Sequence, residues 1–162
     1  MTVDPARPDW LTAIRRYLIA VTAGNLVWET AQMPLYTLWG TGSAREIAAA
    51  VLHCTLGDLM IATLGLAAAL ALVGVPTWPA QRAGAVMAMV AAGTVGYAIY
   101  SEYFNTVLNK SWAYTEVMPR LPWLGTGLSP LAQWLIVPAA ALVWAGRGRR
   151  SWPGPLSGER PA

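Results

Sequence analysis

The chain has 162 residues, of which 56% are hydrophobic and only 12% are charged, and its mean hydropathy is +0.42. Charged residues make up about a quarter of an ordinary soluble domain, so this composition excludes that class and indicates a polytopic membrane protein. The formal charge of +3 suits attachment to anionic lipid of a bilayer, and we expect no nucleic-acid partner.

Apolar stretches of about 20 residues with few charges predict helices that cross a membrane. Four such stretches occur, at residues 16–38, 47–73, 82–104 and 123–144. We therefore expect an all-α protein whose residues 16–146 form a bundle of four transmembrane helices. Residues 1–15 are expected to be a cytoplasmic N-terminal segment, and residues 147–162, which are basic and rich in Gly and Pro, a disordered cytoplasmic tail.

The polar residues of the first stretch fall on one side of the expected helix. Four of them are spaced i, i+4, i+7 and i+11, namely Asn25, Glu29, Gln32 and Tyr36. This spacing places them along one stripe of an α-helix and predicts a polar face directed into the bundle. Pro34 removes one backbone hydrogen bond and is expected to kink the helix near Glu29.

The second stretch carries the only histidine and the only cysteine of the chain, His53 and Cys54. A single cysteine excludes an intrachain disulfide and a CxxC redox centre. Asp58 is rotated from His53 by roughly 140° around a helix, so the two side chains cannot both point at the bundle axis. We expect one of them to face a neighbouring helix or the edge of a cavity.

Further polar residues lie around the connection between the third and fourth stretches. Glu102, Asn105 and Asn109 share a helical stripe, and Gln133 follows Ser129 by one helical turn. The loop 109–122 contains Trp112 and Tyr114 and is amphipathic, so we expect it to fold back over the end of the bundle. Two roles remain open for this loop, a lid and an anchor in the membrane interface.

The distribution of Lys and Arg predicts the orientation in the membrane. With four crossings, both termini lie on one side, which carries eight of these residues, whereas the other side carries three, Arg45, Lys110 and Arg120. Because cytoplasmic loops are enriched in Lys and Arg, we expect both termini in the cytoplasm and the polar halves of the helices toward the periplasm.

This asymmetry predicts a polar site in the outer half of the bundle, because an ionised side chain in hydrocarbon persists only when it is paired, hydrated or used. The candidate catalytic residues are Glu29, His53 and Glu102. The candidate ligand-binding residues are Asn25, Gln32, Tyr36, Asp58, Asn105, Trp112, Tyr114 and Gln133.

Several functions fit such a site, and the sequence does not choose among them or identify a cofactor. Glu29, His53 and Glu102 could hold a divalent metal ion. The same residues could perform metal-free acid/base chemistry on a lipophilic small molecule, or relay protons in a small transporter, in which a homodimer would enclose the path. Alternatively, polar residues that only join helices would suit an accessory or assembly subunit with a membrane-protein partner.

The segments 28–36, 53–58, 111–114, 118–119 and 130–134 carry a family resemblance. They contain the phrases Trp-Glu-x-x-Gln-x-Pro-Leu-Tyr and Ser-Trp-Ala-Tyr followed by Met-Pro. In these phrases the chain resembles an uncharacterised family of small four-helix bacterial membrane proteins, over most of residues 16–144. The resemblance implies the four-helix architecture and location in the bacterial inner membrane, and it implies no activity.

Overall fold

The computed structural model describes residues 10–73, 78–79 and 81–147. Most of these residues are helical. In chain order the elements are α1 (Trp10–Gln32), the 3-10 turn η1 (Met33–Leu35), α2 (Leu38–Thr41), α3 (Ala44–Val73), α4 (Ala83–Tyr103), the π-helical turn η2 (Phe104–Leu108) and α5 (Leu128–Gly146).

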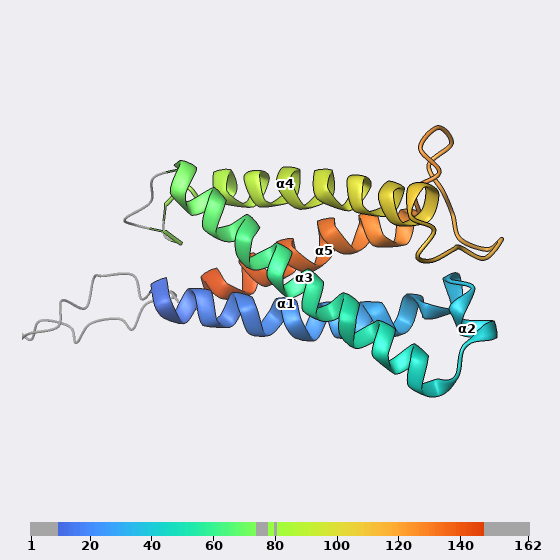
Figure 1. Ribbon diagram of the computed structural model, residues 1–162. Helices are drawn as coiled ribbons and strands as arrows, with labels where there is room; N and C mark the ends of the chain where they lie inside the picture. The colour runs from blue at the N-terminus through green and yellow to red at the C-terminus, as the bar shows by residue number, and fades with distance from the viewer. Residues whose placement is uncertain (1–9, 74–77, 80, 148–162) are drawn as a thin grey trace, which may run out of the picture.

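The four long helices lie side by side and alternate in direction, so that α1 begins and α5 ends at the same end of the molecule (Figure 1). α1 packs against α3 and α5, and α4 also packs against α3 and α5. The helices therefore surround a common interior. We call the end that carries α2 and residues 109–127 the loop end.

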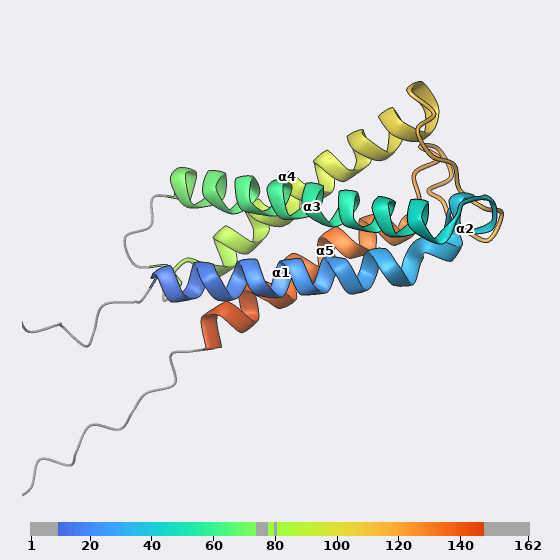
Figure 2. The same cartoon turned by 60° about the horizontal axis from the view of Figure 1, so that its bottom comes forward.

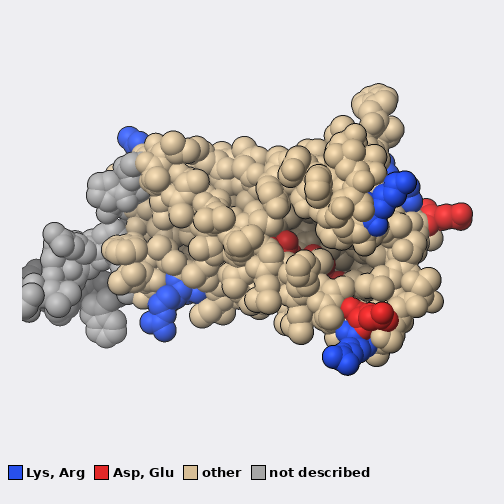
Figure 3. Space-filling view, viewed as in Figure 1, with Lys and Arg blue, Asp and Glu red and all other residues tan. Residues whose placement is uncertain are grey.

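Three of these helices are long and apolar enough to cross a membrane, namely Ala44–Val73, Ala83–Leu108 and Leu128–Gly146. This confirms a helical chain suited to a membrane. α1 does not belong to this group, because Arg15, Arg16 and Glu29 interrupt its apolar residues. On the face seen in Figure 3, Lys and Arg lie toward the two ends of the molecule, and the band between them shows charged residues only as Asp or Glu in a hollow.

The helix ends differ from those expected from hydropathy. α1 runs from Trp10 to Gln32 rather than over 16–38. Pro34 has no N–H to continue the α-helix, and the backbone tightens into η1, closed by the Tyr36 N–H donating to the Met33 carbonyl at 3.0 Å. Pro34 therefore ends the helix instead of kinking it. Of the predicted terminal segments, 1–15 and 147–162, residues 1–9 and 148–162 lie outside the described residues, whereas residues 10–15 belong to α1.

Small residues let the helices approach closely away from the loop end, as is common in membrane bundles. A Cβ added at Gly24 of α1 would lie 2.8 Å from Val137 of α5, and one added at Gly65 of α3 would lie 3.2 Å from Thr94 of α4. The buried apolar side chains of this half form its core, including Tyr17, Val21, Ala62, Leu66, Val86 and Val90.

At the loop end, α3 and α4 diverge, as two views related by a rotation agree (Figures 1 and 2). The loop after η2 is tied to the chain that follows α1. Thr37 N–H donates to the Ala113 carbonyl at 2.9 Å, and Thr115 N–H donates to the Leu35 carbonyl at 2.9 Å. The loop therefore folds back over the end of the helices, as its amphipathic sequence predicts.

Candidate functional site

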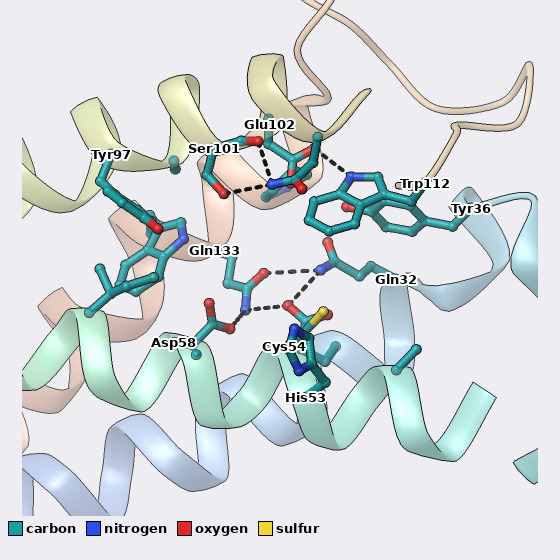
Figure 4. A pocket seen from close by; sticks show the side chains of 18 of the residues that line it. Gln32, Tyr36, His53, Cys54, Asp58, Tyr97, Ser101, Glu102, Trp112 and Gln133 are labelled. Carbon is teal, nitrogen blue, oxygen red and sulfur yellow. Dashed lines mark hydrogen bonds between the residues drawn. The ribbon is translucent and has the colours of Figure 1, made fainter. Parts of the chain in front are cut away.

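A cavity of about 370 Å³ lies between the four long helices near the loop end (Figure 4). Its polar lining includes nine of the eleven residues proposed from the sequence as catalytic or ligand-binding, namely Glu29, Gln32, Tyr36, His53, Asp58, Glu102, Asn105, Trp112 and Gln133. Asn25 and Tyr114 do not line the cavity, but each contacts a residue that does.

α1 contributes the inner end of the cavity through the stripe that the spacing predicts. Asn25, Glu29 and Gln32 are 1%, 7% and 4% exposed, whereas Leu26 and Val27 between them are exposed. The stripe faces α5 and α3, which pack against α1. Helical periodicity alone therefore positions these three polar groups in the interior.

Gln133 of α5 is the centre of the polar network at this inner end (Figure 4). Its Nε2 lies 2.9 Å from Glu29 Oε1, 2.9 Å from Asp58 Oδ2 and 3.2 Å from Asn25 Oδ1. Its Oε1 accepts from Gln32 Nε2 at 3.1 Å. One carboxamide thus connects α5 with α1 and α3.

The donors of this network are fewer than its acceptors. A carboxamide nitrogen carries two hydrogens, but Gln133 Nε2 faces three acceptors. Two of these acceptors belong to carboxyl groups, because Glu29 Oε1 and Asp58 Oδ2 each lie 2.9 Å from Gln133 Nε2. The two acids therefore lie next to the same donor in the interior.

The network continues outward along α1 and α5. Gln32 Nε2 donates to Glu29 Oε1 at 2.9 Å, and its Oε1 accepts from Ser129 Oγ at 2.8 Å. Ser129 in turn accepts from the Trp28 indole N–H at 3.2 Å. Trp28 precedes Glu29 and lies off the polar stripe of α1. Its hydrogen bond to Ser129 could not be predicted from helical spacing, because the two residues are 101 positions apart in the sequence.

Glu102 of α4 lies on the same cavity but has separate partners from the outer loop. Its Oε2 accepts from the Tyr114 hydroxyl and, at 3.5 Å, from the Trp112 indole N–H. Tyr114 also accepts the Gly127 N–H at 3.1 Å, and the Arg120 guanidinium lies 5.2 Å from its ring centre. Burial, with the hydrogen bond to Glu102, raises the pKa of the Tyr114 hydroxyl, so it remains a donor near neutral pH.

α3 settles the question left open for His53 and Asp58. Asp58 is buried, 9% exposed, and joins the Gln133 network, whereas His53 is exposed at the edge of the cavity. Cys54 lies beside His53 and is half-buried. The rotation between the two positions on the helix thus separates an inner acid from an outer imidazole.

The three residues considered from the sequence as possible metal ligands, Glu29, His53 and Glu102, do not converge. Among the described residues there is no group of three or more His, Cys, Asp or Glu that could hold a metal ion. Glu29 is bonded to Gln32 and Gln133, Glu102 is bonded to the outer loop, and His53 lies at the edge. The three side chains share a cavity without sharing a coordination point.

Asn105, which was proposed from its spacing, lines the cavity, but its Nδ2 donates to the Ser101 carbonyl at 2.9 Å within its own helical segment. This hydrogen bond uses part of its donor capacity within the protein.

Other parts of the lining were not predicted as site residues. The apolar and aromatic lining was missed because such residues look like ordinary core in sequence; it includes Met33, Gly57, Met60, Ile61, Tyr97, Ala98 and Trp134.

The cavity opens sideways, between α3 and α4. Figure 3 shows Asp or Glu residues at the bottom of a hollow in that face of the molecule. Met60 of α3 and Tyr97 of α4 both line the cavity and are 58% and 44% exposed. They mark the two sides of the opening.

Comparison of the chain with protein-family models, with curated proteins and with solved structures found no match.

Proposed function

We propose that this chain is an integral membrane protein whose cavity binds a lipophilic small molecule through the polar group of that molecule. One observation carries the proposal. Three buried carboxyl groups, those of Glu29, Asp58 and Glu102, line a cavity that opens between two helices of membrane-spanning length. Burying a carboxyl group within a membrane-spanning region is energetically unfavourable, and such groups are retained where they have a function.

The proposal includes α1 as a fourth crossing helix. α1 packs against two of the apolar helices and alternates with them in direction (Figure 1). The side chains of Asn25, Glu29 and Gln32 face the interior. The surface of α1 that faces lipid is therefore more apolar than the composition of the whole helix. The excess of Lys and Arg on the side of the termini supports a cytoplasmic location for both termini, and the family resemblance supports the bacterial inner membrane.

A purely structural role would explain the polar residues less well. Interhelical hydrogen bonds in membranes contribute about 0.6 kcal/mol each, and the described residues provide no Lys or Arg among the cavity lining to pair with three acids. Joining helices does not require an open cavity beside the acids. A site for a ligand requires both.

Acid/base chemistry at the same site is the second candidate, favoured by the proximity of Glu29 and Asp58, whose carboxyl oxygens both lie 2.9 Å from Gln133 Nε2. A carboxyl pair that holds one proton presents an acid and a base side by side, the arrangement that carboxylate enzymes use. The same pair would serve a proton-coupled transporter. Acid/base chemistry would act on the lipophilic molecule that we assign to the cavity.

The test fills the cavity without disturbing the packing. Gly57 lines the cavity, and a Cβ added there meets no atom within 4 Å. Its position continues the lining stripe of Ala50, Cys54 and Ile61, so a Gly57→Phe side chain should project into the space. Gly96 of α4 is exposed, does not line the cavity and is equally open, so Gly96→Phe is the matched control.

We expect native mass spectrometry of the protein, purified in lipid nanodiscs, to detect a small lipophilic molecule bound to the wild type and to Gly96→Phe. Gly57→Phe should lose it, with an unchanged thermal melting curve. The same occupancy in all three proteins, or no bound molecule in any of them, would count against a ligand site in this cavity.

A further inference from the structure

We propose that the ligand is a lipophilic cation, such as an amine or quaternary ammonium on an apolar body, and that it enters the cavity from the bilayer between α3 and α4. This inference rests on the proposed function, which it makes specific in charge and in route of entry.

The route follows from how α3 and α4 are arranged. The two helices are close where Gly65 faces Thr94, because an added Cβ would lie 3.2 Å from the threonine methyl. They diverge from there toward the loop end (Figures 1 and 2), and the cavity occupies the widening space. Met60 of α3 lines the cavity and is 58% exposed, so the α3 side of the opening carries apolar surface suited to lipid chains.

The loop end itself offers a poorer entrance. Tyr36 and Tyr114 form a backbone bridge there, and their rings are in contact with centres 5.5 Å apart. Trp112 and Tyr114 both bond to Glu102 beneath them. A molecule that arrives from water at this end would have to displace these contacts, whereas one that arrives from the bilayer would not.

The charge follows from the inventory of donors and acceptors. Glu29, Asp58 and Glu102 supply carboxyl oxygens, and no Lys or Arg lies among the cavity lining that the structure describes. The amide N–H groups of Gln32 and Gln133 are directed at protein acceptors, and the loop donors are directed at Glu102. The donors next to the three acids are thus used by the protein itself, and the described lining holds carboxyl groups without a Lys or Arg to balance them, which suits a cation and disfavours an anion.

The walls of the cavity add a second feature that cations favour. Tyr36, Tyr97, Trp112 and Trp134 all line the same space as the acids. The faces of such rings attract ammonium groups within about 6 Å, and more strongly when water is excluded. Carboxyl groups surrounded by aromatic rings, beside an apolar entrance, match an amphiphile whose head is positive and whose body is hydrophobic.

The test compares three probes that share an alkyl chain. Dodecyltrimethylammonium carries the cation, its tert-butyl analogue has the same shape without charge, and dodecyl sulfate carries the opposite charge. Binding is measured by equilibrium dialysis against the full-length protein in nanodiscs, after subtraction of binding to empty nanodiscs. We expect the cation to bind about tenfold or more tightly than the neutral analogue, and dodecyl sulfate to show no specific binding.

Variants then locate the binding. Glu29→Gln, Asp58→Asn and Glu102→Gln should each weaken binding of the cation and leave binding of the neutral analogue unchanged. Glu46→Gln is the matched control, because Glu46 is an exposed carboxylate on α3 that bonds only to Ser43 and does not line the cavity. If a carboxamide variant does not fold, the comparison of the three probes on the wild type still decides.

The outcomes separate this inference from the proposed function. Equal binding of the cation and the neutral analogue, with both abolished by Gly57→Phe, would overturn the preference for cations and leave a lipophilic site. Cation binding that Gly57→Phe does not change would mean that the cation binds outside the cavity, and would overturn this inference. Failure of all three probes, together with the absence of any bound molecule in the purified protein, would overturn both proposals.

Discussion

At the scale of single residues, Gln133 is the centre of the buried hydrogen-bond network. Its single carboxamide contacts acceptors on α1 and α3, and it is 1% exposed. Gln133→Ala would leave the Glu29 and Asp58 carboxyl groups without that donor. A buried polar group that loses its partner costs about 1–3 kcal/mol, so we expect a clear loss of thermal stability in detergent. Leu135→Ala, at an exposed position of the same helix, should change it little.

Cys54 provides a natural reporter of access to the cavity. It lines the cavity and is the only cysteine of the chain. If the opening faces lipid, the neutral reagent N-ethylmaleimide should label Cys54 faster than a charged sulfonate thiol reagent does, and the cationic probe should slow labelling. A Cys54→Ser, Trp123→Cys protein is the control, because residue 123 is 95% exposed and should react with both reagents. Rapid labelling of Cys54 by the charged reagent would indicate entry from water.

The outer loop depends on the hydroxyl of Tyr114, and this dependence should vary with pH. The pKa of Tyr114 in the folded protein is raised from the usual value of 10.0, first by burial and then by the hydrogen bond to Glu102. The stability that this hydroxyl contributes is therefore present in full below pH 10.0 and is lost as the pH rises toward the folded value. We expect the difference in melting temperature between wild type and Tyr114→Phe to be constant from neutral pH to pH 10.0 and to shrink above pH 10.0. A difference that already falls at neutral pH would contradict this assignment.

At the scale of elements, Gly24 determines how closely α1 and α5 approach each other at their interface, which we call the seam. A Cβ at Gly24 would lie 2.8 Å from Val137 Cγ1, which is closer than real Cβ contacts. Gly24→Ala should destabilise the protein by about 1–3 kcal/mol, the usual cost of overpacking. Val137→Ala removes the clashing methyls, so the double variant should be more stable than the sum of the two single changes predicts. Gly93→Ala, where nothing lies within 4 Å, is the control. Additive effects would mean that the seam relaxes in another way.

At the scale of the whole molecule, the sequence predicted what periodicity and hydropathy can encode. The polar stripe of Asn25, Glu29 and Gln32 faces the interior as its spacing predicts, and three apolar helices have membrane-spanning length. What the sequence could not predict depends on contacts between distant positions. The pairing of Gln133 with Asp58 spans 75 positions, and the divergence of α3 from α4, which creates the cavity, leaves no local pattern.

The orientation in the membrane is the property on which the location of the site depends. Eight Lys or Arg residues on the side of the termini against three on the other predict cytoplasmic termini. A phosphatase that is active only in the periplasm should therefore be inactive when fused after Ala162, and active when inserted beside the exposed Trp123 in the outer loop. Western blots that show equal amounts of both fusions are needed as the control. The reverse pattern would move the cavity to the cytoplasmic leaflet. Activity at both sites would mean that α5, the helix between the two fusion points, does not cross the membrane. In that case Gln133 would reach the cavity from a helix lying outside the apolar region, and the polar network that joins α5 to α1 and α3 would not lie within one leaflet of a four-helix bundle.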